Sequence, residues 1–479
     1  MPSQSSRSTT PSSLEIAYTD KPVSGWGGLV LPFRFFEKVR LSEWLSRALP
    51  DGRTSNNQIP ILDMVLALFA LVLTGGRRFA HVERLRNDSV IRGILGADRL
   101  PSAMTLTRYF GGFVQAQVEH LTQVLSTWSW AWIDPPAEGE ILDLDSTVFQ
   151  RYGRQQGSLV GYNPSKRGRP SHHPLMAFLA HSKLVAHAWL RSGNSGSARG
   201  AEAFLDETLA LLPEDLPLRG LRADSGFFIL KFLRAVEAKK LPYAIAVKLN
   251  PRVKREIAGI SQWREFGEGL EVGELAYKTH SWKRSRRMVV IRESIEQRPD
   301  AAGRLLFDLP EYRFHQIVTS MSEPGEEVWR FYNGRADAEN RIKELKHDLG
   351  ADGFCLKSFD GTEAVFRLIC FLYNVLQIFK REVLDNDRRH LTQIRHSTFV
   401  VGAILGSSGR RRMLRLGLKK RRRRQFEALV QRLGDLNVST VMHQLNELIN
   451  QSLGPPRRWR RRASRGRSGG DFLAMASSN

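Results

Sequence analysis

The residues best suited to chemistry lie within one stretch, FYNGRADAENRIKELKHDLG at 331–350. Its candidate functional side chains are Tyr332, Arg335, Glu339, Lys343 and Lys346. Successive residues on an α-helix turn by about 100°, so all five fall on one face about 80° wide. The apolar residues gather on the neighbouring face, which is typical of a helix packed on a core. One carboxylate among fixed cations could hold a metal ion beside groups that bind phosphate.

The same stretch also fits an ordinary solvent-exposed helix face. Glu339 and Lys343 are spaced i,i+4, and such pairs often add only about 0.2–0.5 kcal/mol to helix stability. The chemical interpretation therefore requires further carboxylates on elements that can meet this helix.

Two aspartates end apolar runs that read as strands. Asp145 ends ILDLD at 141–145, and Asp224 ends LRGLRAD at 218–224. Open α/β sheets place their sites at such strand ends. Asp143 lies two residues before Asp145, on the same face of the strand, and is the alternative first acid. Each aspartate alone could equally be a turn or helix-cap residue.

Together, Asp145, Asp224 and Glu339 form the set of acids that two-metal phosphoryl chemistry needs. Carboxylates on two strands and a helix can hold two Mg²⁺ ions about 4 Å apart. One ion activates water or a 3′-hydroxyl, and the other stabilises the leaving oxygen. We expect Mn²⁺ to substitute for Mg²⁺.

The spacing of Tyr332, Arg335, Glu339 and Lys346 matches the Y-(2)-R-(3)-E-(6)-K signature of insertion-sequence DDE transposases. LDLDSTVF at 142–149 resembles the first-Asp motif of that family, and LRADSGF at 221–227 resembles the second. GYNPSKRGRPSHHPLMAF at 161–178 is similar to the strand-two region of one branch. The resemblance covers roughly residues 140–380. It implies an α/β RNase H-like catalytic domain, with a mixed five-stranded sheet flanked by helices.

The resemblance also implies roles for these residues. Asp145, Asp224 and Glu339 would bind the metals, while Tyr332, Arg335 and Lys346 would contact phosphates of the transposon end; Lys343 shares their stripe. The implied function is recognition of terminal inverted repeats, Mg²⁺-dependent DNA cleavage and 3′-OH strand transfer, by cut-and-paste, in a homodimer on double-stranded DNA. The alternatives are an RNase H-like nuclease without strand transfer and an inactive DNA-binding derivative.

One position departs from the family pattern. Ala336 stands where some members carry an aromatic residue that helps hold a flipped base. Trp282 or Tyr312 could stack a base instead, although burial in a core is the other interpretation of each. His172 and His173 have no Cys or further His at zinc spacing, which argues against a zinc site.

Composition supports a polyanionic partner. The 479 residues include 72 Lys and Arg against 49 Asp and Glu, a net charge of +23. This favours nucleic acid, with a ribosomal or membrane-surface protein as the alternative.

Two cysteines, Cys355 and Cys370, offer no disulfide framework and indicate a reducing compartment. The longest apolar run, 64–73, is too short to span a bilayer and predicts a buried helix. We therefore expect a cytoplasmic, nucleoid-associated bacterial protein without a membrane partner.

The domain organisation is predicted from changes in pattern along the chain. The expected parts are a disordered leader (1–20), an all-α DNA-binding domain (21–135), a catalytic domain (136–385) with a β-rich insertion at about 250–322, a basic helical region (386–453) and a basic disordered tail (454–479). The tail contains PPRRWRRRASRGR at 455–467, which is suited to neutralising a DNA backbone.

Overall fold

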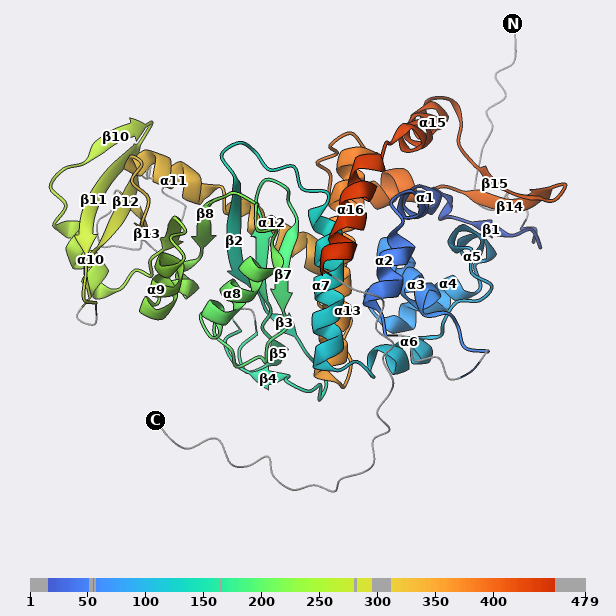
Figure 1. Ribbon diagram of the computed structural model, residues 1–479, viewed down its shortest axis with the longest axis horizontal. Coiled ribbons are helices and arrows are strands. Elements are labelled where there is room, and N and C mark those ends of the chain that lie inside the picture. Colours follow the sequence, from blue (N-terminus) through green and yellow to red (C-terminus); the bar gives the residue numbers. More distant parts are fainter. Residues whose placement is uncertain are drawn as a thin grey trace, which may run out of the picture.

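The structure is a computed structural model that describes residues 16–50, 55, 57–163, 166–279, 282–294 and 312–452. Figure 1 shows an elongated molecule with a β-rich end, a central sheet and a helical end. Residues 16–20 of the predicted leader are exposed and lack regular secondary structure. The rest of the leader and the predicted tail at 454–479 lie outside the described residues.

A mixed sheet forms the centre of the molecule. Its central strands are β2 (Glu140–Ser146), β6 (Leu175–Leu179), β7 (Val185–Trp189), β8 (Leu218–Ala223) and β9 (Tyr243–Ala246). They lie in the order β7-β6-β2-β8-β9. β2, β8 and β9 run parallel, whereas β6 is antiparallel to both β2 and β7. The helices α8 (Ala201–Leu211) and α9 (Leu230–Ala238) follow β7 and β8 respectively. The prediction of a mixed α/β sheet with helices is therefore confirmed.

We predicted a five-stranded sheet, but the sheet continues beyond these five strands. After α10 (Pro251–Ala258) come β10 (Arg264–Gly267), β11 (Leu270–Tyr277), β12 (Arg286–Ser294) and β13 (Tyr312–Thr319). β13 pairs antiparallel with β9, and the insertion extends the sheet to nine strands. The edge of β9 would otherwise present unpaired backbone groups, which β13 satisfies. A separate small sheet contains β3 (Phe149–Gln150), β4 (Leu159–Val160) and β5 (Pro170–His172).

The helical end is built around two long helices. α7 (Gln115–Trp130) packs against α13 (Phe359–Glu382), and Figure 1 shows them side by side next to the sheet. Among the described residues, α13 alone is long and apolar enough to cross a membrane, but 94% of its most apolar window is buried inside the protein. The predicted buried helix at 64–73 lies within α3. The smaller helices are α1 (Val30–Lys38), α2 (Leu41–Ala48), α3 (Ile61–Leu73), α4 (Glu83–Arg86), α5 (Ser89–Leu95) and α6 (Ala103–Phe110).

A strand near the N-terminus and a hairpin in the C-terminal part meet in a third sheet. β1 (Val23–Ser24) pairs with β14 (Ala403–Ser408), which forms a hairpin with β15 (Arg411–Leu416). Gly28 permits this approach, because a Cβ there would lie 2.0 Å from the Thr398 carbonyl oxygen. The N-terminal part is therefore not purely α-helical, and the C-terminal part is not purely helical.

The hairpin was missed because its arginines dominated the sequence pattern. Its strands nevertheless carry apolar residues, and Gly409 between them adopts a φ of +59°, a turn conformation that suits glycine. The remaining C-terminal helices are α14 (Leu391–Ile394), α15 (Lys420–Asp435) and α16 (Ser439–Ser452).

Candidate active site

Asp145 and Asp224 are brought together by the register of β2 and β8. These parallel strands pair Leu144 with Ala223, and each aspartate is the next residue along its chain after this pair. Asp145 is 7% exposed, and its Oδ1 accepts the Ser146 N–H at 2.7 Å. Asp224 follows β8 directly, and its Oδ1 accepts the Gly226 N–H at 2.9 Å. Both carboxylates are thus fixed by local backbone donors at one end of the sheet.

Glu339 is linked to Asp145 through Arg335. It lies on α12 (Ala336–Lys343), with its side chain half exposed. Arg335 Nη2 donates to Glu339 Oε1 at 2.7 Å, and Arg335 Nη1 donates to Asp145 Oδ2 at 3.1 Å. One guanidinium therefore bridges acids that are far apart in sequence.

The aspartates are crowded with negative charge. Burial, with the nearby charges of Asp224 and Glu339, raises the pKa of Asp145 to about 7, although Arg335 opposes the shift. Burial also raises the pKa of Asp224, and Glu339 adds to the rise. The Gly226 N–H, Arg335 and Lys248 oppose that shift. A divalent cation would relieve this repulsion.

The donor set suits Mg²⁺ or Mn²⁺, because all three side chains offer hard carboxylate oxygens. Their ligand atoms do not all lie within 4.8 Å of one another. Asp145, Asp224 and Glu339 therefore offer the donor chemistry that a divalent cation prefers.

A second group of side chains does place its potential ligand atoms within 4.8 Å of one another. Among the described residues, Glu344, Asp348 and His390 are the one such set of potential ligands. Glu344 Oε1 already accepts the Leu391 N–H at 3.2 Å and lies 3.9 Å from the Lys380 Nζ. Asp348 accepts the Thr392 hydroxyl at 2.8 Å. Protein donors thus already engage both carboxylates of this group.

The predicted continuous helix at 331–350 is interrupted. α11 (Gly325–Asn333) ends before Gly334, α12 begins at Ala336, and a π-helix occupies Glu344–Asp348. At the junction, the Arg335 N–H bonds to the Tyr332 carbonyl rather than to Phe331. Arg222 Nη1 donates to the freed Phe331 carbonyl at 2.8 Å. An arginine from β8 therefore takes the place of one helical hydrogen bond.

Asp143, the alternative first acid, is occupied by this arginine. Its two carboxylate oxygens accept from Arg222 Nε at 2.5 Å and Nη2 at 2.7 Å. Asp143 is fully buried, and Arg341 lies 3.9 Å from its Oδ2. The side chain is fixed by two arginines, so it supports the junction of α11 and α12 and is not available as a metal ligand.

The other polar residues of the predicted stripe have different environments. The Tyr332 ring lies beside Arg335, whose Cζ is 5.9 Å from the ring centroid. Lys346 Nζ donates to the Val148 carbonyl at 3.2 Å, within the segment that follows Asp145. Burial lowers the pKa of Lys346. Lys343 is exposed. Tyr332 and Arg335 therefore lie close to the acids and Lys346 is held by the segment after Asp145, whereas Lys343 faces solvent.

Several supporting residues were missed by the sequence analysis. Arg222 lies on a strand and Arg341 on a helix, and neither position marked the residue as part of a site. Lys248, exposed just after β9, acts on Asp224 through its charge. The one available signal was the placement of Arg222 between the apolar residues Leu221 and Ala223, since arginine is seldom buried without a partner.

The minor candidates also have clear environments. His172 accepts from Arg151 Nε at 2.9 Å, and His173 Nε2 lies 3.2 Å from the Ser146 hydroxyl. Burial lowers the pKa of each histidine to about 4.

Trp282 is buried under Arg286, whose Cζ lies 4.5 Å from the ring centroid. Arg292 covers Tyr312 in the same way, at 4.7 Å. These contacts favour structural roles for all four residues.

Comparison with known proteins places the chain in a family. No curated protein matches the chain. A cryo-EM structure of the piggyBac transposase synaptic complex with hairpin DNA is similar at 12% identity and a TM-score of 0.43, covering 90% of this chain and 87% of that one. The family model described as "Transposase DDE domain group 1" matches residues 7–438. The match spans most of the 479 residues, and the chain belongs to this family of DDE transposases.

Proposed function

We propose that this protein is a cut-and-paste transposase that cleaves the ends of its own element and joins them to target DNA. The observation that carries the proposal is the grouping of Asp145, Asp224 and Glu339 around Arg335. Two bound Mg²⁺ ions would activate the nucleophile and stabilise the leaving oxygen of an in-line displacement. The DNA would be held in line at the carboxyl ends of β2 and β8.

The residues around the acids support roles in binding and orienting DNA. Arg335 presents a guanidinium that can leave the carboxylates to bind a phosphate in bidentate fashion. Lys346 and Tyr332 flank the same place, and Lys343 extends the positive charge toward solvent. The RNase H-like catalytic core of the proposal is supported by the strand order β7-β6-β2-β8-β9 with β6 antiparallel.

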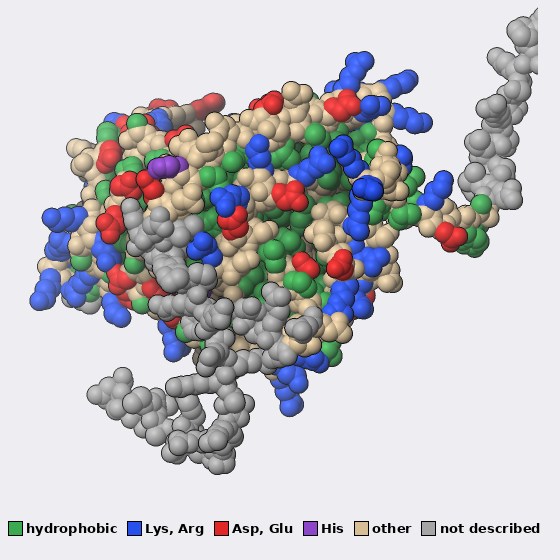
Figure 2. Space-filling model, turned by 45° about the vertical axis from the view of Figure 1, so that its right-hand side comes forward, with side chains coloured by type: hydrophobic (Ala, Val, Ile, Leu, Met, Phe, Trp, Pro, Cys, Tyr) green, Lys and Arg blue, Asp and Glu red, His purple; other side chains and the backbone are tan. Residues whose placement is uncertain are grey.

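Recognition of the inverted repeats is assigned to the helical end together with the basic C-terminal elements. α15 begins with Lys420 and four arginines that are exposed. Figure 2 shows Lys and Arg side chains spread over one face, with several projecting at its upper right. Such charge neutralises backbone phosphates and gives salt-dependent binding. We further propose that two copies hold the two ends of the element.

Cleavage of DNA carrying the sequences that flank the gene tests the proposal. Asp145→Asn, Asp224→Asn and Glu339→Gln should each abolish Mg²⁺-dependent nicking while end binding is retained. Asp337→Asn is the matched control, because Asp337 is an exposed acid on the same helix as Glu339. Normal cleavage by a folded Glu339→Gln protein would overturn the assignment of the third acid.

Strand transfer separates the proposal from its alternatives. A transposase joins the 3′-OH of a pre-cut end to a new duplex, whereas a simple nuclease only cuts. An inactive DNA-binding derivative would do neither, although it would still bind the ends. Either of these results would contradict the proposed activity.

A further inference from the structure

A large cavity lies away from the candidate active site. Its volume is about 950 Å³, and it is bounded by α7, the end of α8, the loop before β8 and α16. Leu216 and Pro217 on its wall lead into the first residue of β8, whereas Asp224 follows the last. A strand of that length separates the two places by about 20 Å. The cavity is therefore distinct from the grouping of Asp145, Asp224 and Glu339.

The cavity is acidic, in contrast to the chain as a whole. The carboxylates on its wall are Glu119, Glu207, Glu214, Asp215 and Glu447. Arg367 is the one Lys or Arg on the wall, and it is paired with Glu363. His187 also lines the cavity, but burial lowers its pKa to about 4, so it is neutral near pH 7. A chain with a net charge of +23 thus contains a concentrated negative pocket.

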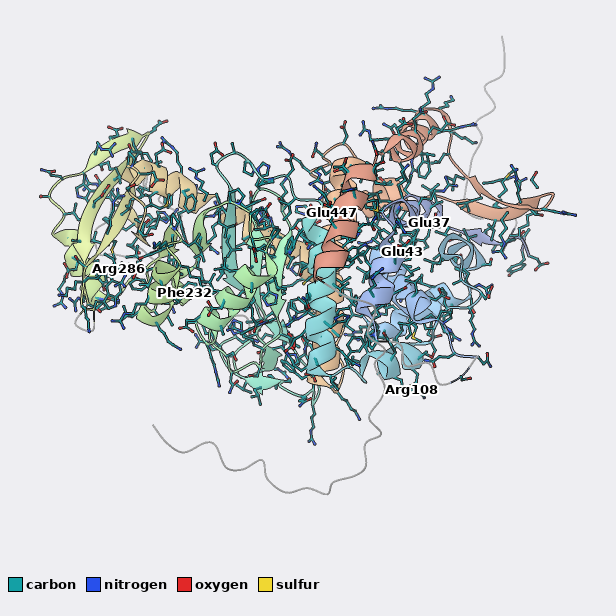
Figure 3. The ribbon with its side chains drawn as sticks, viewed as in Figure 1. Glu37, Glu43, Arg108, Phe232, Arg286 and Glu447 are labelled. Carbon is teal, nitrogen blue, oxygen red and sulfur yellow. The ribbon has the colours of Figure 1, made fainter. Side chains whose placement is uncertain are left out.

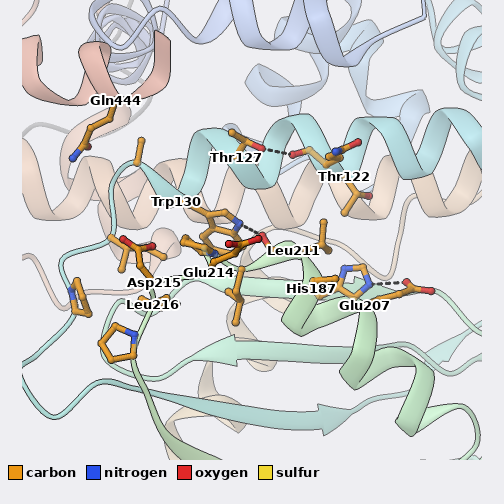
Figure 4. Close-up of a pocket in the computed structure, with 18 of the residues that line it drawn as sticks. Thr122, Thr127, Trp130, His187, Glu207, Leu211, Glu214, Asp215, Leu216 and Gln444 are labelled. Atoms are coloured by element: carbon orange, nitrogen blue, oxygen red, sulfur yellow. Dashed lines mark hydrogen bonds and ion pairs between the residues drawn. The ribbon is translucent and has the colours of Figure 1, made fainter. Parts of the chain in front are cut away.

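Two of these acids are free to bind a cationic ligand. Glu214 and Asp215 are exposed, and neither forms an ion pair within the described part of the chain. Figure 4 shows both beside Trp130, with Gln444 on the neighbouring α16. Trp130 Nε1 donates to the Leu211 carbonyl at 2.6 Å, which fixes the ring at the wall. Unpaired carboxylates beside a fixed indole suit a ligand that combines guanidinium groups with an aromatic ring.

Such a ligand follows directly in the same chain. α16 supplies Gln444 and Glu447 to the wall and extends to Ser452, and Figure 3 shows Glu447 on that helix. Residues 457–467, RRWRRRASRGR, contain seven arginines and Trp459. Only Leu453, Gly454 and two prolines separate this segment from α16. About ten extended residues reach up to about 35 Å, so the segment can return to the cavity.

We propose that the acidic cavity holds the basic segment 457–467 of the same chain and withholds it from DNA. The argument rests on charge complementarity and on the place where the described chain ends. Phosphates compete with the carboxylates for the arginines, so DNA binding would release the segment. The competition with DNA rests on the proposed function, whereas binding of the segment in the cavity does not.

Photo-cross-linking of the full-length protein tests the binding itself. With p-benzoylphenylalanine in place of Trp459, we expect cross-links to peptides around 119–135 and 207–217. Glu214→Lys/Asp215→Lys should lower their yield about five-fold or more, since attraction becomes repulsion at two exposed sites. Glu265→Lys/Glu268→Lys, an equal charge change on exposed residues of the insertion, should leave the yield unchanged. Cross-links without preference for the cavity, or equal losses in both variants, would overturn the proposal.

A mixture of isotopically heavy and light protein identifies the source of the segment. Same-chain binding gives light–light and heavy–heavy cross-links only, whereas mixed products would show a second copy and overturn the same-chain assignment. Non-specific DNA binding provides the second readout. The cavity variant should bind several-fold more tightly, with a steeper salt dependence, than the insertion variant of identical charge. Equal DNA affinities of the two variants would exclude competition between the cavity and DNA. Binding of the segment in the cavity would then be decided by the cross-linking result.

Discussion

Asp143 and Arg222 form a buried bidentate pair directly opposite each other on β2 and β8, with N–O distances of 2.5 and 2.7 Å. The remaining amino group of Arg222 donates to the Phe331 carbonyl where α11 gives way to α12. The pair therefore links the sheet that carries Asp145 to the helix that carries Glu339. We therefore expect the position of Glu339 to depend on this salt bridge.

Removal of one partner of this pair should be strongly destabilising. Asp143→Leu leaves the buried Arg222 without its carboxylate, which we expect to cost about 3–5 kcal/mol in the free energy of unfolding. Asp143→Leu/Arg222→Met removes both charges and should recover much of that loss. Recovery will be incomplete, because the Phe331 carbonyl also loses its donor, at about 1–3 kcal/mol. Urea unfolding measures both effects; additive losses in the double variant would show that the two residues are not coupled.

The pKa of Asp145 predicts how stability of the metal-free protein depends on pH. The folded value of about 7 lies above the unfolded value near 3.9, so the folded state binds the proton more tightly. The resulting stabilisation is present below pH 4 and is lost as the pH rises through 7. In EDTA, Asp145→Asn should therefore flatten the change in urea midpoint between pH 5 and pH 8. An identical pH profile in the variant would contradict the raised pKa.

Gly226 is predicted to position Asp224. A Cβ at this residue would lie 2.7 Å from Ser197 Cβ and 3.0 Å from Asp224 Oδ1. Gly226→Ala should therefore displace the Asp224 carboxylate and lower the cleavage rate about ten-fold or more, since small misplacements are costly in catalysis, with little effect on end binding. Gly196→Ala is the matched control in the neighbouring loop, because nothing lies within 4 Å of its Cβ position. Equal rates for the two variants would argue against this role.

Lys343 and Lys346 should have separable effects. Lys343 is exposed, so Lys343→Gln should weaken binding of transposon ends and reduce the slope of log affinity against log salt by about 0.9. Lys346 is tied to the segment after Asp145, and Lys346→Gln should also lower the cleavage rate of bound DNA. Binding titrations at several salt concentrations and single-turnover cleavage measure the two quantities. A Lys343→Gln protein with an unchanged salt slope would exclude its phosphate contact.

The sequence predicted the two strands that lead to Asp145 and Asp224 and the buried helix at 64–73, but not how the elements are joined. Strand-length apolar runs ending at Asp145 and Asp224 identified β2 and β8. Such features depend on local sequence. The donor that Arg222 supplies to the Phe331 carbonyl, where the helix before Glu339 is interrupted, could not be predicted, because Arg222 lies on a distant strand.

The same limit applies to the sheet and to Asp143. Pairing of β13 with β9 depends on contacts between segments separated by three strands. Asp143 and Asp145 have the same alternation in the sequence, and only the position of Arg222 distinguishes the paired aspartate from the one beside Asp224. Side-chain partners across a sheet are set by register, which the sequence of one strand does not contain.

The pairing of β1 with β14 has a consequence for folding during synthesis. Val23 and Ser24 find their strand partners at Ile404 and Ala403, which a ribosome adds only near the end of synthesis. Chains elongate at about 5–20 residues per second, so the helical end must wait tens of seconds, with β1 unpaired, for its last strands. A polypeptide truncated before residue 403 would lack this closure altogether, and premature termination would yield a protein unable to complete its helical end.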